Sequence, residues 1–401
     1  MSVADIMQGA AYRRIVEVLE AEHERTVEDI VALTEIPAPP FGEGPKGAHY
    51  LEMLRAHGLE DVERDGVGNA MGLRRGAGNG KLIVVAAHLD TVFPAGTDVK
   101  VRREGTKLFA PGVGDDTRSL AVLLAYMRAL DAAGVRTMAD ILFVGDVGEE
   151  GLGDLRGIRH LFTEGKYKGR IEAFFTVDSP DMDGLVVGGV GSKRYRATFR
   201  GPGGHSFGAF GLVSPAFAMG QAMLELSRIL VPAKPKTTFS ASVFGGGTSV
   251  NSIPNEVWVE VDLRSEAPVE LARLEARFLA IVEQAAAAEN HARSTAQGAI
   301  TVEAKLIGDR PAGSTAMDSD IVRHSTAALQ AHGIEVRHVY SSTDANIPMS
   351  LGIPAVKIGS GGTGGRGHSL DEWIDVEKTN SVRGMAAGLT AILAVAGVSA
   401  P

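Results

Sequence analysis

The chain of 401 residues contains no cysteine, which excludes disulfides, cysteine-liganded zinc and thiol catalysis. It also lacks any run of about 18 apolar residues, and its first residues have no apolar core of the signal-peptide type. Positive charge is in deficit, because 40 Lys and Arg face 49 Asp and Glu, for a net charge of -9. Such a protein lacks the basic face that nucleic acid or an anionic membrane would require. We therefore expect a soluble, cytoplasmic protein with no nucleic-acid or membrane partner.

What is present is an ordinary globular composition, with 44% hydrophobic and 22% charged residues, and the length suggests two or three domains. Apolar positions at helical spacing predict one helix over residues 11–34 and a second near 46–57. Short apolar runs of the buried-strand type follow, namely KLIVVAAHLD, DILFVGDVGEE, EAFFTVDSP and IPAVKIGSGG. Helical stretches such as SLAVLLAYMRALDAAG separate some of them. This alternation predicts an α/β fold with a mostly parallel sheet that has helices on both faces.

The stretch from about 192 to 307 follows a different order: strand, helix, strand, strand, helix, strand. This βαββαβ order is typical of a small ferredoxin-like domain. Because strands and helices alternate again afterwards, the small domain is predicted to be inserted into the larger one. We expect residues 1–191 and 308–401 to form the catalytic domain, and residues 192–307 to form the inserted domain.

Acidic residues and histidines gather where the predicted parallel strands end, or in the loops that follow them. The set is His88, Asp90, Asp115, Asp116, Glu149, Glu150, Asp178 and His368. In open α/β sheets, ligands bind in the crevice beyond the carboxyl ends of the strands. We therefore expect these side chains to meet at one edge of the sheet.

Several carboxylates packed together repel one another, and most would have to take up protons unless cations balanced them. Mixed histidine and carboxylate ligands suit zinc, and manganese or cobalt less selectively. Two histidines and three carboxylates are more than one catalytic zinc ion needs, since it uses three protein ligands and keeps an open position. They fit two metal ions that share a bridging carboxylate, an arrangement that activates water.

The segment GPGGHSFG (201–208) raises a rival chemistry, because Gly204 to Gly208 fits the G-x-S-x-G pattern of serine hydrolases. A triad of Ser206, Asp344 and His368 would have the chain order of an α/β-hydrolase. Against it, residues 201–204 separate the serine from the preceding strand, and the segment lies in the inserted domain. A relative that binds metal without catalysis is a second alternative, although every proposed ligand is present.

A second glycine-rich segment, GSGGTGGRG, precedes His368. Its main-chain N–H groups, with those of Gly361 and Gly362 among them, are candidates to hold an anionic group of the substrate. The alternative is a flexible loop that only leads to His368.

Several motifs together resemble those of one known family. They are AHLDTV (87–92), GVGDDTRSLAVLL (112–124), GEEGLGDLRG (148–157), TVDSP (176–180), GPGGHSFG (201–208), GGGTSVNSIPNEVWVEVDLR (245–264) and GGTGGRGHSLDEW (361–373). They occur in the order of the co-catalytic di-zinc amidohydrolases and peptidases of peptidase clan MH, which include carboxypeptidase G, aminoacylase, succinyl-diaminopimelate desuccinylase and peptidase T. The resemblance covers nearly the whole chain.

The resemblance implies that each chain binds two zinc ions, with cobalt or manganese as substitutes. His88 and Asp178 would bind one ion. Glu150 and His368 would bind the other, and Asp115 would bridge both.

Further roles follow from the same resemblance. Glu149 is similar to the family's general base, which takes a proton from the metal-bridged water and hands it to the leaving amine. Asp90 would orient the metal-binding histidine two residues before it. His205 matches a lid histidine that the partner subunit supplies to the oxyanion, so the inserted domain would serve as lid and as homodimer interface. Asn251 and Arg264 match lid residues that grip a substrate carboxylate, with a turn and a surface ion pair as the alternatives.

The bridging residue has two further features. The family tends to have a cis peptide after it, which would be Asp115–Asp116 here. Many relatives continue with one residue, then Lys and Gly, where this chain has Thr117 and Arg118 after Asp116. This departure removes no ligand, but it predicts a local difference beside the site.

We therefore expect zinc-dependent hydrolysis of an amide bond in a small peptide, of the dipeptidase, tripeptidase or aminopeptidase type. An N-acyl-amino-acid amidohydrolase or a carboxypeptidase G-like enzyme is the alternative within the same family.

Overall fold

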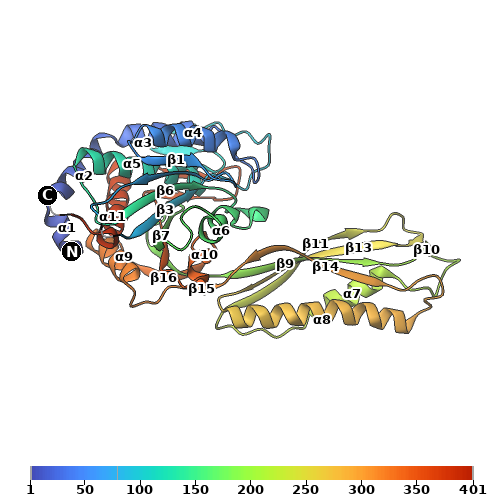
Figure 1. Cartoon of the computed structure of the whole chain (residues 1–401). Coiled ribbons are helices and arrows are strands. Elements are labelled where there is room, and N and C mark those ends of the chain that lie inside the picture. The colour runs from blue at the N-terminus through green and yellow to red at the C-terminus, as the bar shows by residue number, and fades with distance from the viewer. Residues whose placement is uncertain (1, 79, 400–401) are drawn as a thin grey trace. The chain divides into compact units, whose positions relative to one another are not determined.

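Figure 1 shows the computed structural model, which describes residues 2–78 and 80–399. The chain forms two compact units. The larger consists of Met1–Gly189 and Ser314–Pro401, and the smaller of Val190–Gly313. Among the helices of the described residues, none is both long enough and apolar enough to span a bilayer.

The larger unit is built on a nine-stranded sheet. Its strands are β1 (Glu60–Arg64), β2 (Ala70–Arg74), β3 (Leu82–His88), β6 (Asp140–Asp146), β7 (Ile171–Val177), β8 (Gly184–Gly189), β15 (Gly313–Ser314), β16 (Arg337–Ser341) and β17 (Ala355–Ile358). The strand order is β1-β2-β6-β3-β7-β17-β8-β15, and β16 pairs with β8. The four central strands β6, β3, β7 and β17 run parallel to one another. The predicted α/β class with a mostly parallel sheet is confirmed.

Helices cover both faces of this sheet (Figure 1). They are α1 (Val3–Gln8), α2 (Ala10–Ala21), α3 (His23–Thr34), α4 (Gly44–Arg55), α5 (Arg118–Ala132), α6 (Arg156–Thr163), α9 (Asp320–Ala331), α10 (Asn346–Ser350) and α11 (Lys378–Ala396). Strand β3 shows how side-chain alternation separates the faces. Ile83 and Val85 lie in the core that contains α5 and α11, whereas Leu82 and Val84 lie in the core that contains α6 and α10.

The structure has two helices where the sequence predicted one. The apolar stripe predicted a single helix over residues 11–34, but the chain turns at Glu22, with φ -97° and ψ 14°, between α2 and α3. Each helix buries its own apolar face, so the spacing within each half was correct and only the continuity was wrong.

A small sheet joins two segments that are distant in the sequence. It consists of β18 (Thr363–Gly365), β19 (Trp373–Asp375), β5 (Lys107–Phe109) and β4 (Arg102–Glu104), in that order. The turn η1 (Val113–Thr117) follows β5, and the loop between β18 and β19 contains His368. This pairing fixes the two loops with respect to each other.

The smaller unit follows the expected βαββαβ order. Its main elements are β9 (Gly191–Arg200), α7 (Pro215–Ser227), β11 (Thr237–Gly246), β13 (Glu256–Ser265), α8 (Pro268–Ala292) and β14 (Thr301–Arg310). The antiparallel sheet has the order β11-β13-β9-β14, and both helices share one apolar core with it. A separate short ladder pairs β10 (Gly204–His205) with β12 (Ser252–Ile253).

Candidate metal centre

The larger unit brings the predicted metal ligands to one edge of its sheet. β3 ends at His88, β6 ends shortly before Glu150, and Asp178 directly follows β7. Since these strands are parallel neighbours, their carboxyl ends lie together, at the place where open α/β sheets bind ligands. Candidate ligand atoms of His88, Asp116 and Asp178 lie within 4.8 Å of one another.

Asp115 lies between two histidines. Its Oδ1 is 3.0 Å from Nε2 of His88, and its Oδ2 is 3.1 Å from Nε2 of His368. Nε2 of His368 is also 2.8 Å from Oε1 of Glu150. Nδ1 of His88 donates to the main-chain oxygen of Asp90 at 2.9 Å, which leaves the Nε2 lone pair of the neutral imidazole for a ligand. The two oxygens of one carboxylate thus face one imidazole each, as a bridging ligand requires.

The carboxylates favour positive charge at both imidazoles. Hydrogen bonds to Asp115 and Glu150 raise the pKa of His368 to about 11. Burial opposes charge on His88, but the hydrogen bond to Asp115 and the neighbouring carboxylates raise its pKa well above its ordinary value. Burial also raises the pKa of Asp178. A divalent cation would take the place of the imidazole protons in such a field, and this set of nitrogen and oxygen donors would suit zinc.

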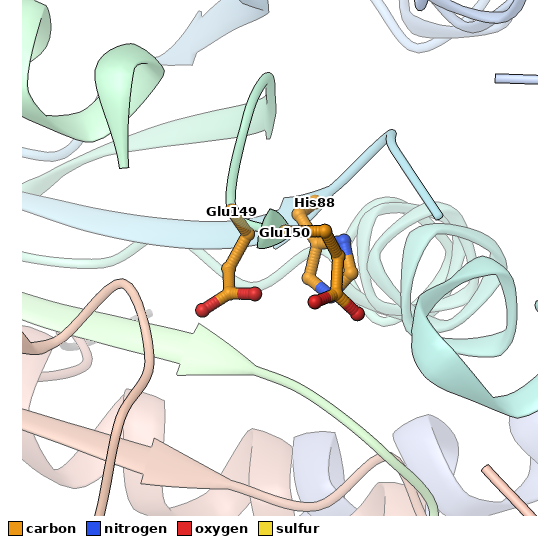
Figure 2. A group of neighbouring side chains, drawn as sticks. All are labelled: His88, Glu149 and Glu150. Carbon is orange, nitrogen blue, oxygen red and sulfur yellow. The ribbon is translucent and has the colours of Figure 1, made fainter. Parts of the chain in front are cut away.

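Glu149 and Glu150 are adjacent on the loop after β6. Both are buried, with 6% and 7% of their surface exposed. One candidate ligand atom of each lies within 4.8 Å of the other and of His88. Figure 2 shows the Glu150 carboxylate beside the His88 imidazole and the Glu149 carboxylate turned to the other side. Two carboxylates of different orientation therefore flank one predicted ligand.

Asp90 is fully buried, and its carboxylate contacts the glutamate loop. Oδ1 accepts the N–H groups of Gly148 at 2.8 Å and Glu149 at 3.1 Å, and Oδ2 accepts that of Glu150 at 2.8 Å. The carboxylate is 3.8 Å from Nδ1 of His88, which instead donates to the Asp90 main chain. Asp90 thus contacts the histidine through its main chain and holds the Glu149–Glu150 loop with its side chain.

Asp116 ties two predicted ligands of the same ion together. Its side chain is fully buried. Oδ2 accepts the main-chain N–H of His88 at 3.1 Å, and Oδ1 accepts that of Ser179, next to Asp178, at 3.2 Å. The Asp115–Asp116 peptide is cis, as the resemblance implied. The sequence placed Asp116 in the acidic cluster but did not predict these two hydrogen bonds.

Glu372 was also missed, although it lies within the motif GGTGGRGHSLDEW (361–373). It is 2% exposed. Oε1 accepts the N–H groups of Gly114 at 2.7 Å and Asp115 at 2.9 Å, and Oε2 accepts that of Gly112 at 2.9 Å. Glu372 thus fixes the loop that presents the predicted bridging carboxylate. Burial raises its pKa to about 7, although the three N–H groups oppose the shift.

Comparison with known proteins identifies the family. Residues 84–394 match peptidase family M20/M25/M40. The chain belongs to this family. Carboxypeptidase G2 of Pseudomonas sp. (strain RS-16) is 28% identical over 199 residues, so the match spans 49% of this chain and less than half, 47%, of that relative. The fold matches aminopeptidase PepT from Bacillus cereus ATCC 10987, with a TM-score of 0.73 and 21% identity over 93% of this chain and 98% of that one. It also matches YxeP of Bacillus subtilis, a dinuclear metal binding peptidase from the M20 family, with a TM-score of 0.68 and 17% identity over 94% and 99%.

The expected family is thus confirmed, and the chain is a hydrolytic enzyme of peptidase family M20.

The smaller unit of this M20 chain carries the predicted oxyanion donor. Nδ1 of His205 accepts the N–H groups of Phe207 and Gly208, both at 3.2 Å, so the neutral imidazole carries its proton on Nε2. The main-chain oxygen of Asn251 accepts the N–H of Ser206 at 2.9 Å. His205 and Asn251 therefore belong to one exposed loop cluster.

Arg264 lies at the other end of the same unit. Its Nε is 2.7 Å from Oδ2 of Asp262, which is the surface ion pair expected as the alternative to substrate binding. Arg264 stands eight residues beyond Glu256, where β13 begins close to the His205 cluster. At about 3.3 Å per residue, this places it roughly 25 Å along the strand. The smaller unit thus does not gather His205, Asn251 and Arg264 at one point.

Gly361 and Gly362 have packing reasons to be glycine. Their φ values are 90° and 75°, which side chains rarely adopt. A Cβ on Gly361 would lie 3.0 Å from the oxygen of Ser381, and one on Gly362 would lie 2.7 Å from that of Asp375. Close main-chain approach accounts for both glycines, and their binding of a substrate anion stays a prediction.

The members of the rival serine triad have other partners. His368 contacts Glu150 and Asp115, whereas Asp344 is buried against Asp146. Burial raises the pKa of Asp146 to about 7 and that of Asp344 well above its ordinary value. A general base oriented by Asp344, as this triad needs, therefore finds no support in these contacts.

Proposed function

We propose that the chain is a dinuclear zinc peptidase that hydrolyses an amide bond in small peptides, of the dipeptidase, tripeptidase or aminopeptidase type. The observation that carries this proposal is the position of Asp115, whose two carboxylate oxygens face His88 and His368. His88 and Asp178 would hold one zinc ion, with cobalt or manganese as substitutes. Glu150 and His368 would hold the other.

The residues around the metals would perform the proton transfers. Bound zinc supplies Lewis acidity and lowers the pKa of water toward 7. Glu149 would accept the proton of the attacking water and return it to the departing amine. Its main-chain N–H is fixed on the Asp90 carboxylate, so Asp90 would hold the base in reach of the scissile bond. Burial of Glu149 limits access of bulk water to the proton that it carries.

A homodimer would complete the site. His205 would donate from Nε2 to the developing oxyanion, and Asn251 would bind the substrate beside it. A dipeptide spans only about 7 Å when extended, far less than the distance from these residues to Arg264 along the strand. This separation supports an arrangement in which the three residues do not all act in the active site of one chain, and His205 acts in the active site of the partner.

The second candidate is an N-acyl-amino-acid amidohydrolase or a carboxypeptidase G-like enzyme. The 28% identity to carboxypeptidase G2 favours it. The same ligands and base would serve this reaction, since both substrates present an amide carbonyl. The two candidates differ in the acyl group that must be accommodated.

The test is a substrate panel together with Glu149→Ala. We expect free dipeptides or tripeptides to be cleaved faster than N-acetyl amino acids when zinc, manganese or cobalt is added, and a chelator to abolish turnover. Glu149→Ala should lower kcat by about 10²- to 10⁴-fold, with two metals per chain retained. Faster cleavage of N-acetyl amino acids would reverse the substrate choice. Unchanged turnover in Glu149→Ala would refute the base, and activity that survives metal removal would refute the metal mechanism.

A further inference from the structure

Lys46 on α4 is a buried cation beneath the candidate metal centre. Only 1% of its surface is exposed, and its Nζ donates to Oγ1 of Thr117 at 3.4 Å. Its neighbour Gly47 packs against Leu89, the residue after the metal-binding His88; a Cβ on Gly47 would lie 3.4 Å from Cδ1 of Leu89. The ammonium therefore contacts the turn that contains Asp115, and the helix that carries it packs against the residue after β3.

A buried ammonium is costly unless negative charge compensates it. Burial lowers the pKa of Lys46 to about 8, and the charges of Asp90, Asp116 and Glu372 oppose that shift. These are the same three buried carboxylates that accept main-chain N–H groups from the ligand loops. One buried cation thus interacts electrostatically with the three carboxyl groups that organise the site.

We infer that Lys46 is a positioning residue of the metal centre. Its ammonium balances the three carboxylates that hold the ligand-bearing loops, so that metal affinity depends on a side chain that touches neither metal nor substrate. The inference rests on the proposed metal site. Without the ammonium, the three desolvated carboxyl groups would take up protons more readily or relax toward water together with their loops.

The sequence around the bridging residue agrees with this role. Thr117, two residues after the predicted bridging Asp115, presents a hydroxyl that accepts a hydrogen bond from Lys46. The chain therefore supplies an ammonium to this turn from α4.

The test uses Lys46→Met, which removes the charge and keeps a flexible apolar stem of similar length. We expect zinc and cobalt to dissociate about 10- to 100-fold more readily from this variant, as is usual when a partner behind a metal ligand is lost. The matched control is Arg128→Met. Arg128 is another buried cation, on α5, whose ion pairs with Asp29 and Glu22 contact no ligand loop. It should lose stability and keep its metal affinity. Adding Thr117→Lys to Lys46→Met should restore most of the lost affinity.

A second readout needs no metal. In the metal-free protein, the amides of residues 148–150 and 112–115 should exchange hydrogen faster in Lys46→Met than in the wild type or Arg128→Met. If the wild-type protein binds no metal, the proposed function fails while this exchange still reports the role of Lys46. A folded Lys46→Met with unchanged affinity and unchanged exchange overturns the inference. So does an equal loss of affinity in Arg128→Met. Should Lys46→Met fail to fold, Thr117→Val is the test, because it removes the hydroxyl that contacts Lys46. We expect its metal affinity to fall about 2- to 10-fold, and an unchanged metal affinity would overturn the inference.

Discussion

Replacing Glu372 by glutamine tests whether a carboxylate that touches no metal sets the metal affinity. Glu372 accepts three N–H groups from residues 112–115, at 2.7, 2.9 and 2.9 Å. Glu372→Gln keeps one oxygen, which can still accept two of these bonds. Its NH2 group would meet the remaining N–H, that of Gly112, donor to donor. Hydrogen bonds to a charged group contribute about 1.5–3 kcal/mol each, so the loop that holds Asp115 should lose about that much. At 1.4 kcal/mol per factor of ten, metal affinity should fall roughly 10- to 100-fold.

The assay is titration of the chelator-treated protein with zinc or cobalt against a competing chelator, with a melting curve to confirm folding. Glu377→Gln is the matched control, because Glu377 also accepts two main-chain N–H groups, from Thr379 and Asn380, but caps α11. That variant should bind metal as the wild type does. Wild-type affinity in a folded Glu372→Gln protein would refute the reasoning, and so would an equal loss in Glu377→Gln.

Two further predictions concern the buried acid pair and the smaller unit. Because the folded-state pKa values of Asp146 and Asp344 lie above their ordinary value near 4, the pair destabilises the fold increasingly as pH rises from about 4 through 7. Asp344→Asn should therefore raise the melting temperature of the metal-free protein at pH 8, by about 2–4 °C per kcal/mol relieved, and the gain should vanish near pH 4; a loss of stability at pH 8 would contradict this. If His205 acts on the partner's substrate, mixing inactive Glu149→Ala and His205→Ala chains should restore about a quarter of wild-type activity, since half of the dimers would be mixed and each would have one intact site. A mixture that exchanges subunits and stays inactive would place His205 elsewhere.

The sheet and the ligand cluster could be predicted from the sequence because both follow from local pattern. The apolar runs before His88, Glu150 and Asp178 form adjacent parallel strands, so position along the chain translated directly into position at one edge. The single helix over 11–34 failed because periodicity records which positions are apolar, and not whether the main chain turns between them.

The supporting carboxylates could not be predicted in the same way. Glu372 and Asp115 are hydrogen-bonded although they are 257 positions apart. The pairing of β19 with β5 brings them together, and no short sequence pattern predicted that pairing. Asp90 was assigned to the site, but its three N–H partners depend on how the loop after β6 curls back. Lys46 lies on an ordinary amphipathic helix, where burial of a lysine is visible only once the tertiary contacts are known.

The contacts also distinguish two groups of acidic residues at the site, which the sequence alone did not separate. Asp90, Asp116 and Glu372 are carboxyl groups whose oxygens accept two or three main-chain N–H groups each, so that part of their lone-pair capacity is already used by the loops. Asp115 and Glu150 instead present oxygens to imidazole nitrogens, where a metal ion can replace the shared proton. Substitution of the first kind should loosen the ligands while leaving them all present, whereas substitution of the second kind should remove a ligand outright. Metal stoichiometry at saturation therefore distinguishes the two groups even where both lower activity.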